Sequence, residues 1–448
     1  MQEELWHSSN RKSQIANRKC LGPVTRRGLI KGTIAASLGF VLGRNFIPAA
    51  WAADDDTGVT IGRNKQLYVP AEGQAKHVIL MWMNGGPSHI DTFDPKPGTP
   101  QAGGAKAIDA SPDLQISANF PLLAKKGKYL CVLRGVHSKE GDHGQATYLM
   151  HTGYREQVGG DMPSIGSIVC AEAKNGPVSD VPSYVSLNGR GGGPGFYGPA
   201  YGPFQVNAGQ PIQDLKAPFA DKDLDARLKV LSQLDKTYSD ETGAPLAIAH
   251  NTTYERVTRF SRSPLSKLFE LKSLDAKAEP YGKSPFGRAC YVAKRLVTEG
   301  NVRFVEINLD GWDLHSDCVN QSKQLCRQVD QPFARLLEEL EAEGKLSETL
   351  IIWMGEFGRT PDLRSGGRDH YPNCFSVALA GGGVKGGQAV GKSNKSGHEP
   401  DGEGISVPDI FHTVCAACGI DATKFRESSD GRPVRIAERG AKQIPGVF

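Results

Sequence analysis

Side chains that could perform chemistry collect in one stretch of the chain, Thr349–Pro372. Within it, Leu350–Met354 is a run of β-formers typical of a strand that is buried on both faces, and Gly355 ends it. Ligands of open α/β sheets bind beyond the carboxyl ends of the strands, so polar residues that follow such a strand are candidates for a site. These residues are Glu356, Arg359, Arg368, Asp369 and His370. A plainer interpretation is that the two arginines pair with Glu356 and Asp369 and only hold the loops in place.

A second set of candidates follows the alternating strand Val302–Leu309, where Asp313 and His315 come close together. Aspartates beside a histidine at a strand end have the composition of half of a zinc or hard-metal site. A helix predicted at Gln331–Glu343 links this strand to the strand before Glu356, and such a βαβ unit has a right-handed crossover. Both loops are then expected at the same edge of the sheet, which favours a metal site.

The strand predicted at His77–Met83 leads into a third candidate loop, which contains Asn84 and Asp91. Its glycines and proline allow the backbone to turn sharply and to approach a ligand closely. The alternative is a turn whose serine and aspartate cap a short helix.

A fourth loop follows the short strand Tyr129–Arg134 and places Asp142 and His143 before a helical run, Gln145–Met150. At a helix N-terminus the free N–H groups and the helix dipole favour an anion. Asp142 as an ordinary N-cap is the competing interpretation, whereas His143 is harder to explain structurally.

The positive charge of the chain is concentrated at its N-terminus. The 448 residues carry a formal net charge of +4, but residues 1–53 hold eight Lys/Arg and two Asp/Glu, which is +6 and leaves −2 for the rest. Without that segment, nucleic-acid binding has no electrostatic support.

The same N-terminal segment has the features of a cleavable export signal. Thr25–Lys31 matches the twin-arginine pattern, an apolar run follows at Gly32–Gly43, and a small-residue site, Ala50–Ala52, comes after Pro48. About 12 apolar residues are too few to span a bilayer as a stable helix, although an uncleaved anchor is the alternative.

We therefore predict an export signal at residues 1–53, a linker at 54–74 and a single domain at 75–448. The twin-arginine translocase would deliver this domain to the periplasm or the exterior, with no stable membrane span after cleavage.

Several motifs, taken together, resemble one bacterial family. They are the leader, HVILMWMNGGPSHIDTFDPKPG, DHGQATYLMHTG, FVEINLDGWDLH, LIIWMGEFGRTP and GRDHYP. The set is similar to the secreted family catalogued as domain of unknown function 1501, in the alkaline phosphatase and sulfatase-like superfamily. The resemblance implies an α/β fold with a mostly parallel central sheet sandwiched between helices, which matches the order of elements above. It also implies hydrolysis of phosphate or sulfate esters with one or two metal ions held by Asp, His and Asn.

Residue by residue, the resemblance suggests ligands but is uneven. Asp313 and His315 resemble the superfamily's Asp and His metal pair, and His370 resembles its last metal histidine. Glu356 begins the segment that occupies the place of an Asp-His-Gly motif, so Phe357 stands where a ligand is expected.

In the N-terminal half, Asn84 lies where the metal aspartate of the first strand is expected, with Asp91 close behind. His143 stands at the position of the nucleophilic Cys or Ser of sulfatases.

From these observations we expect an exported, metal-dependent hydrolase of phosphate, sulfate or related esters. The ligands of a divalent ion (zinc, calcium or manganese) would be Asp313, His315, Glu356 and His370, with Asn84, Asp91 and Asp142 as supplementary ligands. His143 would act as nucleophile or as general acid/base. Arg359 and Arg368 would clamp the anionic ester or glycan substrate bidentately.

The alternative is a catalytically degenerate protein on the same fold that binds a glycan or an envelope partner. Hydrolysis requires the four main ligands to converge on one point that faces His143, whereas a binding protein could leave them scattered in local salt bridges.

Overall fold

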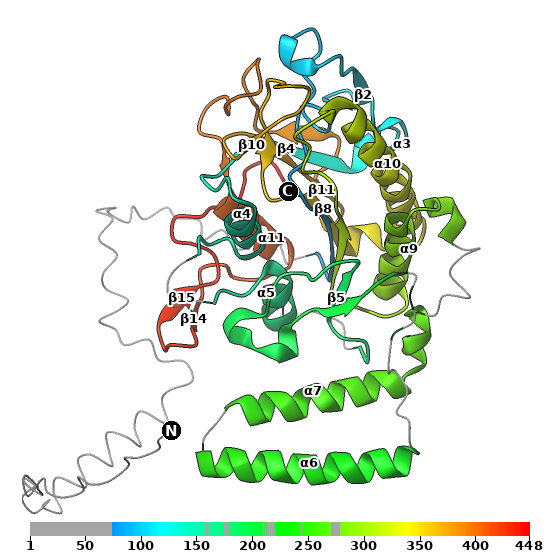
Figure 1. Ribbon diagram of the computed structural model, residues 1–448, viewed down its shortest axis with the longest axis vertical. Coiled ribbons are helices and arrows are strands. Elements are labelled where there is room, and N and C mark those ends of the chain that lie inside the picture. The colour runs from blue at the N-terminus through cyan, green and yellow to red at the C-terminus, as the bar shows by residue number, and fades with distance from the viewer. Residues whose placement is uncertain are drawn as a thin grey trace, which may run out of the picture. The chain divides into compact units, whose positions relative to one another are not determined.

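A nine-stranded sheet forms the centre of the computed structural model (Figure 1). The structure describes residues 74–156, 161–173, 179–208, 210, 212, 220–242, 245–269 and 278–448. The predicted export signal and nearly all of the predicted linker lie outside these residues, so their boundaries and that of the main domain stay predictions.

The strand order in this sheet is β12-β4-β11-β8-β1-β7-β5-β6, with β13 paired to β4. The strands are β1 (His77–Met83), β4 (Leu130–His137), β5 (Tyr184–Leu187), β6 (Phe204–Val206), β7 (Phe304–Leu309), β8 (Thr349–Met354), β11 (Phe375–Ala380), β12 (Gln388–Val390) and β13 (Ile405–Ser406). β11 runs antiparallel to both of its neighbours, and the other pairs of this sheet are parallel. The predicted α/β fold with a mostly parallel sheet is confirmed.

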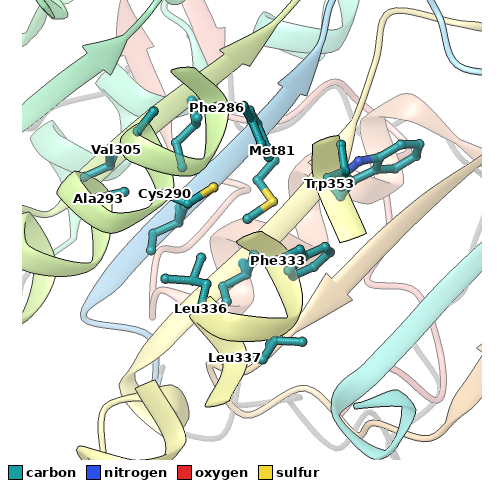
Figure 2. Close-up of a cluster of buried hydrophobic side chains, with 14 of the residues drawn as sticks. Met81, Phe286, Cys290, Ala293, Val305, Phe333, Leu336, Leu337 and Trp353 are labelled. Carbon is teal, nitrogen blue, oxygen red and sulfur yellow. The ribbon is translucent and has the colours of Figure 1, made fainter. Parts of the chain in front are cut away.

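Helices cover both faces of the sheet (Figure 1). They are α9 (Pro285–Thr298) and α10 (Cys318–Ala342) on one face, and α4 (His143–Thr152), α5 (Ile165–Glu172) and α11 (Val407–Ala417) on the other. Because side chains alternate along a strand, β1 contributes Met81 to the cluster with α9 and α10, and Trp82 to the cluster with α4 and α11. Figure 2 shows Met81 with Phe286 of α9 and Phe333 of α10.

Smaller elements surround this core. They are β2 (Ala107–Ser111), β3 (Leu114–Ser117), α3 (Pro121–Ala124), α6 (Asp221–Thr242), α7 (Pro245–Arg262), β9 (Gly358–Arg359), β10 (His370–Tyr371), β14 (Phe425–Glu427), β15 (Pro433–Arg435) and short 3-10 turns. In the part of the chain that is described, no helix has the length and apolar character needed to cross a membrane.

Helix α10 begins earlier than the sequence predicted. The predicted start at Gln331 is wrong, because α10 begins at Cys318. Pro332 suits the first turn of a helix, but here it lies in the interior of α10. The preceding turns bury Leu325, Cys326 and Val329 against the core. Burial of this apolar stripe outweighs the hydrogen bond that the proline cannot donate.

The sheet topology brings the candidate loops together. β1, β4, β7 and β8 point the same way, so the loops that follow them open at one carboxyl edge. β11 is reversed and therefore begins at this edge. Just before it, β10 pairs with β9 and sets His370 opposite Arg359.

Shortening a side chain in the core between α10 and the sheet should lower the free energy of unfolding strongly. We expect Phe333→Ala to lower the free energy of unfolding by about 3–5 kcal/mol, because the side chain is fully buried in the cluster that holds Met81 and Trp353. Val230→Ala on α6, where the side chain is 56% exposed, should change it by less than about 0.5 kcal/mol. Urea denaturation measures both values, and equal losses would contradict the packing.

Candidate metal site at the carboxyl edge

Three histidines surround the carboxylate of Asp313 in the loop after β7. Its Oδ1 lies 2.9 Å from His315 Nε2 and 3.3 Å from His370 Nε2, and its Oδ2 lies 3.4 Å from His143 Nε2. The Nε2 atoms of His315 and His370 are 3.2 Å apart. Asp313, His315 and His370, which the sequence predicted as ligands, therefore converge on one point, and His143 faces it.

The far nitrogens of two of these rings are held by acceptors. His143 Nδ1 lies 2.7 Å from Glu356 Oε1, and His370 Nδ1 lies 2.9 Å from the carbonyl oxygen of Gly141. A carboxylate and a carbonyl only accept hydrogen bonds, so each Nδ1 carries the proton. In the neutral rings, both Nε2 atoms then present lone pairs to the cluster.

With these tautomers, imidazole lone pairs face the carboxylate of Asp313, so that acceptors meet without a proton between them. The Nε2 lone pairs of His143 and His370 point at the carboxylate of Asp313, and His143 Nε2 is buried without a hydrogen-bond partner among the described residues. Arg359 donates to Asp313 Oδ1 and relieves part of this repulsion, and a proton on an imidazole or a metal cation among the ligands would relieve the rest. One ligand atom from each of His143, Asp313 and His370 lies within 4.8 Å of the others, so the donor set fits a single ion.

Glu356 supports this cluster from behind. It is fully buried, and besides the Nδ1–H of His143 it accepts the backbone N–H of Gly85 at 2.8 Å. A carboxylate that holds the far nitrogen of a metal histidine fixes the tautomer and the direction of the ring. The structure thus places Glu356 behind His143, whereas the sequence predicted it among the ligands.

Arg359 is also placed differently from the predicted anion clamp. Its guanidinium is buried and donates to the carbonyls of Gly85, Gly86 and Arg368 and to Asp313 Oδ1. Partial burial raises the pKa of Asp313, but the hydrogen bond and charge of Arg359 outweigh this and lower it to about 2. Arg359 therefore keeps Asp313 ionised and oriented, and its donors are directed at the protein.

Arg368 lies in the interior, away from the cluster. Its Nε donates to Asp91 Oδ2 at 2.9 Å, and its other nitrogens donate to the carbonyls of Gln101, Thr360 and Pro361. Both charged side chains are buried. Arg368 therefore holds loops in place, as the plainer interpretation of the arginines proposed. Its partner is Asp91 and not Asp369.

Two predicted supplementary ligands have local partners as well. Asn84 donates from Nδ2 to Asp310 Oδ1 at 2.9 Å. Asp142 is the N-cap of α4 and accepts the N–H groups of Gly144 and Gln145. The simpler N-cap interpretation of Asp142 therefore describes its position.

Aromatic packing orients the histidines further. The ring of Phe357 stacks on His370 with centroids 4.6 Å apart and lies 5.0 Å from His143. Gly86 allows this approach, because a Cβ there would meet the Phe357 ring at 2.5 Å and its φ is +79°. Phe357 therefore serves as a packing surface for the histidines.

Sequence reasoning missed the backbone groups of the site. The N–H of Gly85 and the carbonyl of Gly141 fix Glu356 and His370, and residue types do not reveal such contacts. Asp369, one of the candidates that follow the strand Leu350–Met354, lies 3.4 Å from His315 Nδ1.

Fold and site together define an α/β protein with a histidine–aspartate cluster at the carboxyl edge of its sheet. The chain belongs to the family described as Protein of unknown function (DUF1501), whose model matches residues 75–448. The family resemblance drawn from the motifs is confirmed. No curated protein matches the sequence.

Similar solved structures include three enzymes. The lipoteichoic acid synthase LtaP from Listeria monocytogenes is 9% identical with a TM-score of 0.39, over 85% of this chain and 78% of that chain. The PsFucS1 sulfatase from Pseudoalteromonas sp. is 13% identical with a TM-score of 0.34, over 78% and 68%. The alkaline phosphatase from the Antarctic bacterium TAB5 is 12% identical with a TM-score of 0.32, over 77% and 98%.

The role of Glu356 leads to a prediction about the tautomer of His143. Glu356→Gln puts a neutral amide beside His143: its oxygen holds the Nδ1–H less strongly than a carboxylate does, and its NH₂ group, where it faces the ring, shifts the ring proton to Nε2. Zinc binding should weaken about 10- to 100-fold, measured by competition with a chromophoric chelator. Glu348→Gln, which alters only contacts to Lys76 and Lys345 at the surface, should leave the affinity unchanged. Equal affinities in the two variants would contradict the assigned role.

Proposed function

We propose that this protein is an exported, metal-dependent hydrolase of phosphate, sulfate or related esters. The observation that carries the proposal is the convergence of the His143 and His370 lone pairs on the carboxylate of Asp313. A metal cation would relieve the repulsion among these acceptors, and two imidazoles with one carboxylate are a ligand set that zinc accepts. This convergence favours the hydrolase over the alternative of a degenerate binding protein.

His143, Asp313 and His370 would hold the ion. Two imidazoles and one carboxylate suit zinc or manganese better than calcium, which takes six to eight oxygen ligands. His143 was expected as nucleophile or general acid/base, but its fixed Nδ1–H and inward Nε2 fit a ligand better.

His315 occupies the exposed rim of the cluster. Its Nε2 lies beside Asp313 Oδ1 and its Nδ1 faces Asp369 at 3.4 Å. This histidine can therefore complete the ligand set, or it can move a proton at Nε2 with Asp369 behind it.

A bound divalent ion would polarise an ester oxygen and lower the pKa of a coordinated water. The chain itself orients the ligands. Glu356 and Gly141 hold the two Nδ1–H groups, Arg359 holds Asp313, and Phe357 packs against two of the rings.

The compartment belongs to the same proposal. The twin-arginine pattern at Thr25–Lys31 supports export by the twin-arginine translocase to the periplasm or the exterior. That route carries proteins that are already folded, so the metal would be loaded in the cytoplasm. The substrate would be an anionic ester or a glycan that carries one.

Metal content tests this proposal directly. Protein purified after export should hold about one divalent ion per chain by elemental mass spectrometry, and Asp313→Ala and His370→Ala should lose it. His398→Ala is the matched control, because His398 pairs with Asp362 instead. The parent should then hydrolyse at least one of p-nitrophenyl phosphate, bis(p-nitrophenyl) phosphate and p-nitrophenyl sulfate, and the two site variants should not. A metal-free parent whose variants are equally well folded would refute the metal site.

A further inference from the structure

A second group of buried ionisable side chains lies behind helix α4. His151 near the end of α4, Glu306 on β7 and Tyr184 on β5 are each no more than 6% exposed. His151 Nε2 lies 3.3 Å from Glu306 Oε1, and the Tyr184 hydroxyl donates to Glu306 Oε2 at 2.6 Å. None of these residues belongs to the cluster around Asp313.

The hydrogen bonds define the charges in this group. His151 Nδ1 donates to the carbonyl of Thr147 at 2.9 Å, so its Nε2 must also carry a proton to bond with Glu306. The Tyr184 oxygen already accepts the N–H of Gly192 at 2.8 Å, which directs its own proton to Glu306. The group is therefore a buried imidazolium–carboxylate pair.

The pKa directions agree with this assignment. Burial lowers the pKa of His151, but the charge and hydrogen bond of Glu306 outweigh this and raise it. Burial raises the pKa of Glu306, but His151 and Tyr184 outweigh this and lower it. Both partners are thus stabilised in their charged forms.

Helix α4 connects this pair to the candidate metal site. His143, Thr147 and His151 follow one another at intervals of four residues and share one face of the helix. With a rise of about 1.5 Å per residue, His151 lies about 12 Å along the axis from His143. The two histidines therefore fix the rotation of α4 about its axis at two points, Glu356 near its start and Glu306 near its end.

His151 also contacts the strand that leads into the site. Its ring lies 4.1 Å from that of Trp82 on β1, just before the loop whose Gly85 N–H donates to Glu356. In addition, the negative charge of Glu356 raises the pKa of His151, so the imidazolium and that carboxylate interact across the helix. His151 thus contacts the strand that leads to Gly85 and interacts with the charge of Glu356.

We propose that His151 and Glu306 are positioning residues for the candidate metal site. They hold α4 in the rotation that keeps His143 Nδ1 on Glu356 and His143 Nε2 directed at Asp313. The part of this inference that concerns metal affinity rests on the proposed function, whereas the part that concerns the direction of His143 does not.

The chain offers a matched control for removing the charge of Glu306. Glu172 at the end of α5 also accepts a tyrosine hydroxyl at 2.6 Å, from Tyr197, and pairs with a cation, Arg426. Glu172→Gln and Glu306→Gln therefore make the same chemical change to similar networks, and only Glu306 faces a residue of α4.

The first readout is the proton NMR signal of the His143 Nδ1–H that is hydrogen-bonded to Glu356, assigned by its absence from His143→Gln. We expect this signal in the parent and in Glu172→Gln, and its loss or a large shift in Glu306→Gln. The second readout is zinc affinity, which should fall about 10- to 100-fold in Glu306→Gln only. Circular dichroism verifies that each variant is folded at the temperature of the measurement.

Unchanged signal and affinity in folded Glu306→Gln would overturn the proposal, and so would equal changes in Glu172→Gln. If Glu306→Gln does not fold, Tyr184→Phe, which removes one donor to Glu306, replaces it. Smaller changes in the same direction would then support the proposal, and no change would overturn it. A parent that binds neither zinc nor manganese would refute the proposed function, and the NMR signal would still decide the positioning role.

Discussion

The carboxylate of Glu356 is fully buried, and the geometry of the candidate site depends on how its charge is satisfied. An unpaired buried carboxylate costs several kcal/mol, so its hydrogen bonds constrain their donors strongly. Here the donors are the N–H of Gly85 and the Nδ1–H of His143. One group thus joins the loop after β8, the loop after β1 and the start of α4. If any of these moved, a buried charge would lose a partner.

The same constraint explains the two arginines. A guanidinium has five N–H donors, so a buried one needs several acceptors around it. The loops supply backbone carbonyls to both Arg359 and Arg368, and Asp313 and Asp91 supply the opposite charges. In the proposed hydrolase, the positive charge that attracts an anionic ester would therefore come from the bound cation and not from these side chains.

The sequence predicted the parts of the fold that depend on apolar runs. β1 has the predicted limits, and the βαβ argument correctly brought the loops of Asp313 and Glu356 to one edge. The predicted start of α10 was wrong, because Pro332 resembles a first-turn proline when only local rules are applied. The position of Glu356 behind His143 could not be predicted, since it depends on a backbone N–H whose direction is set by the folded loop. Sequence patterns report burial well, but they carry little information about hydrogen bonds to the main chain.

The reversal of β11 is what allows His370 to join the site. In a wholly parallel sheet, residues that precede a strand lie at the amino edge, far from the loops that carry Asp313 and Glu356. Because β11 is antiparallel, the chain just before it returns to the carboxyl edge, and pairing of β10 with β9 sets His370 opposite Arg359. The carbonyl of Gly141 then fixes the ring. The motif GRDHYP suggested His370 as a ligand, and the order and direction of the strands explain how it reaches the cluster.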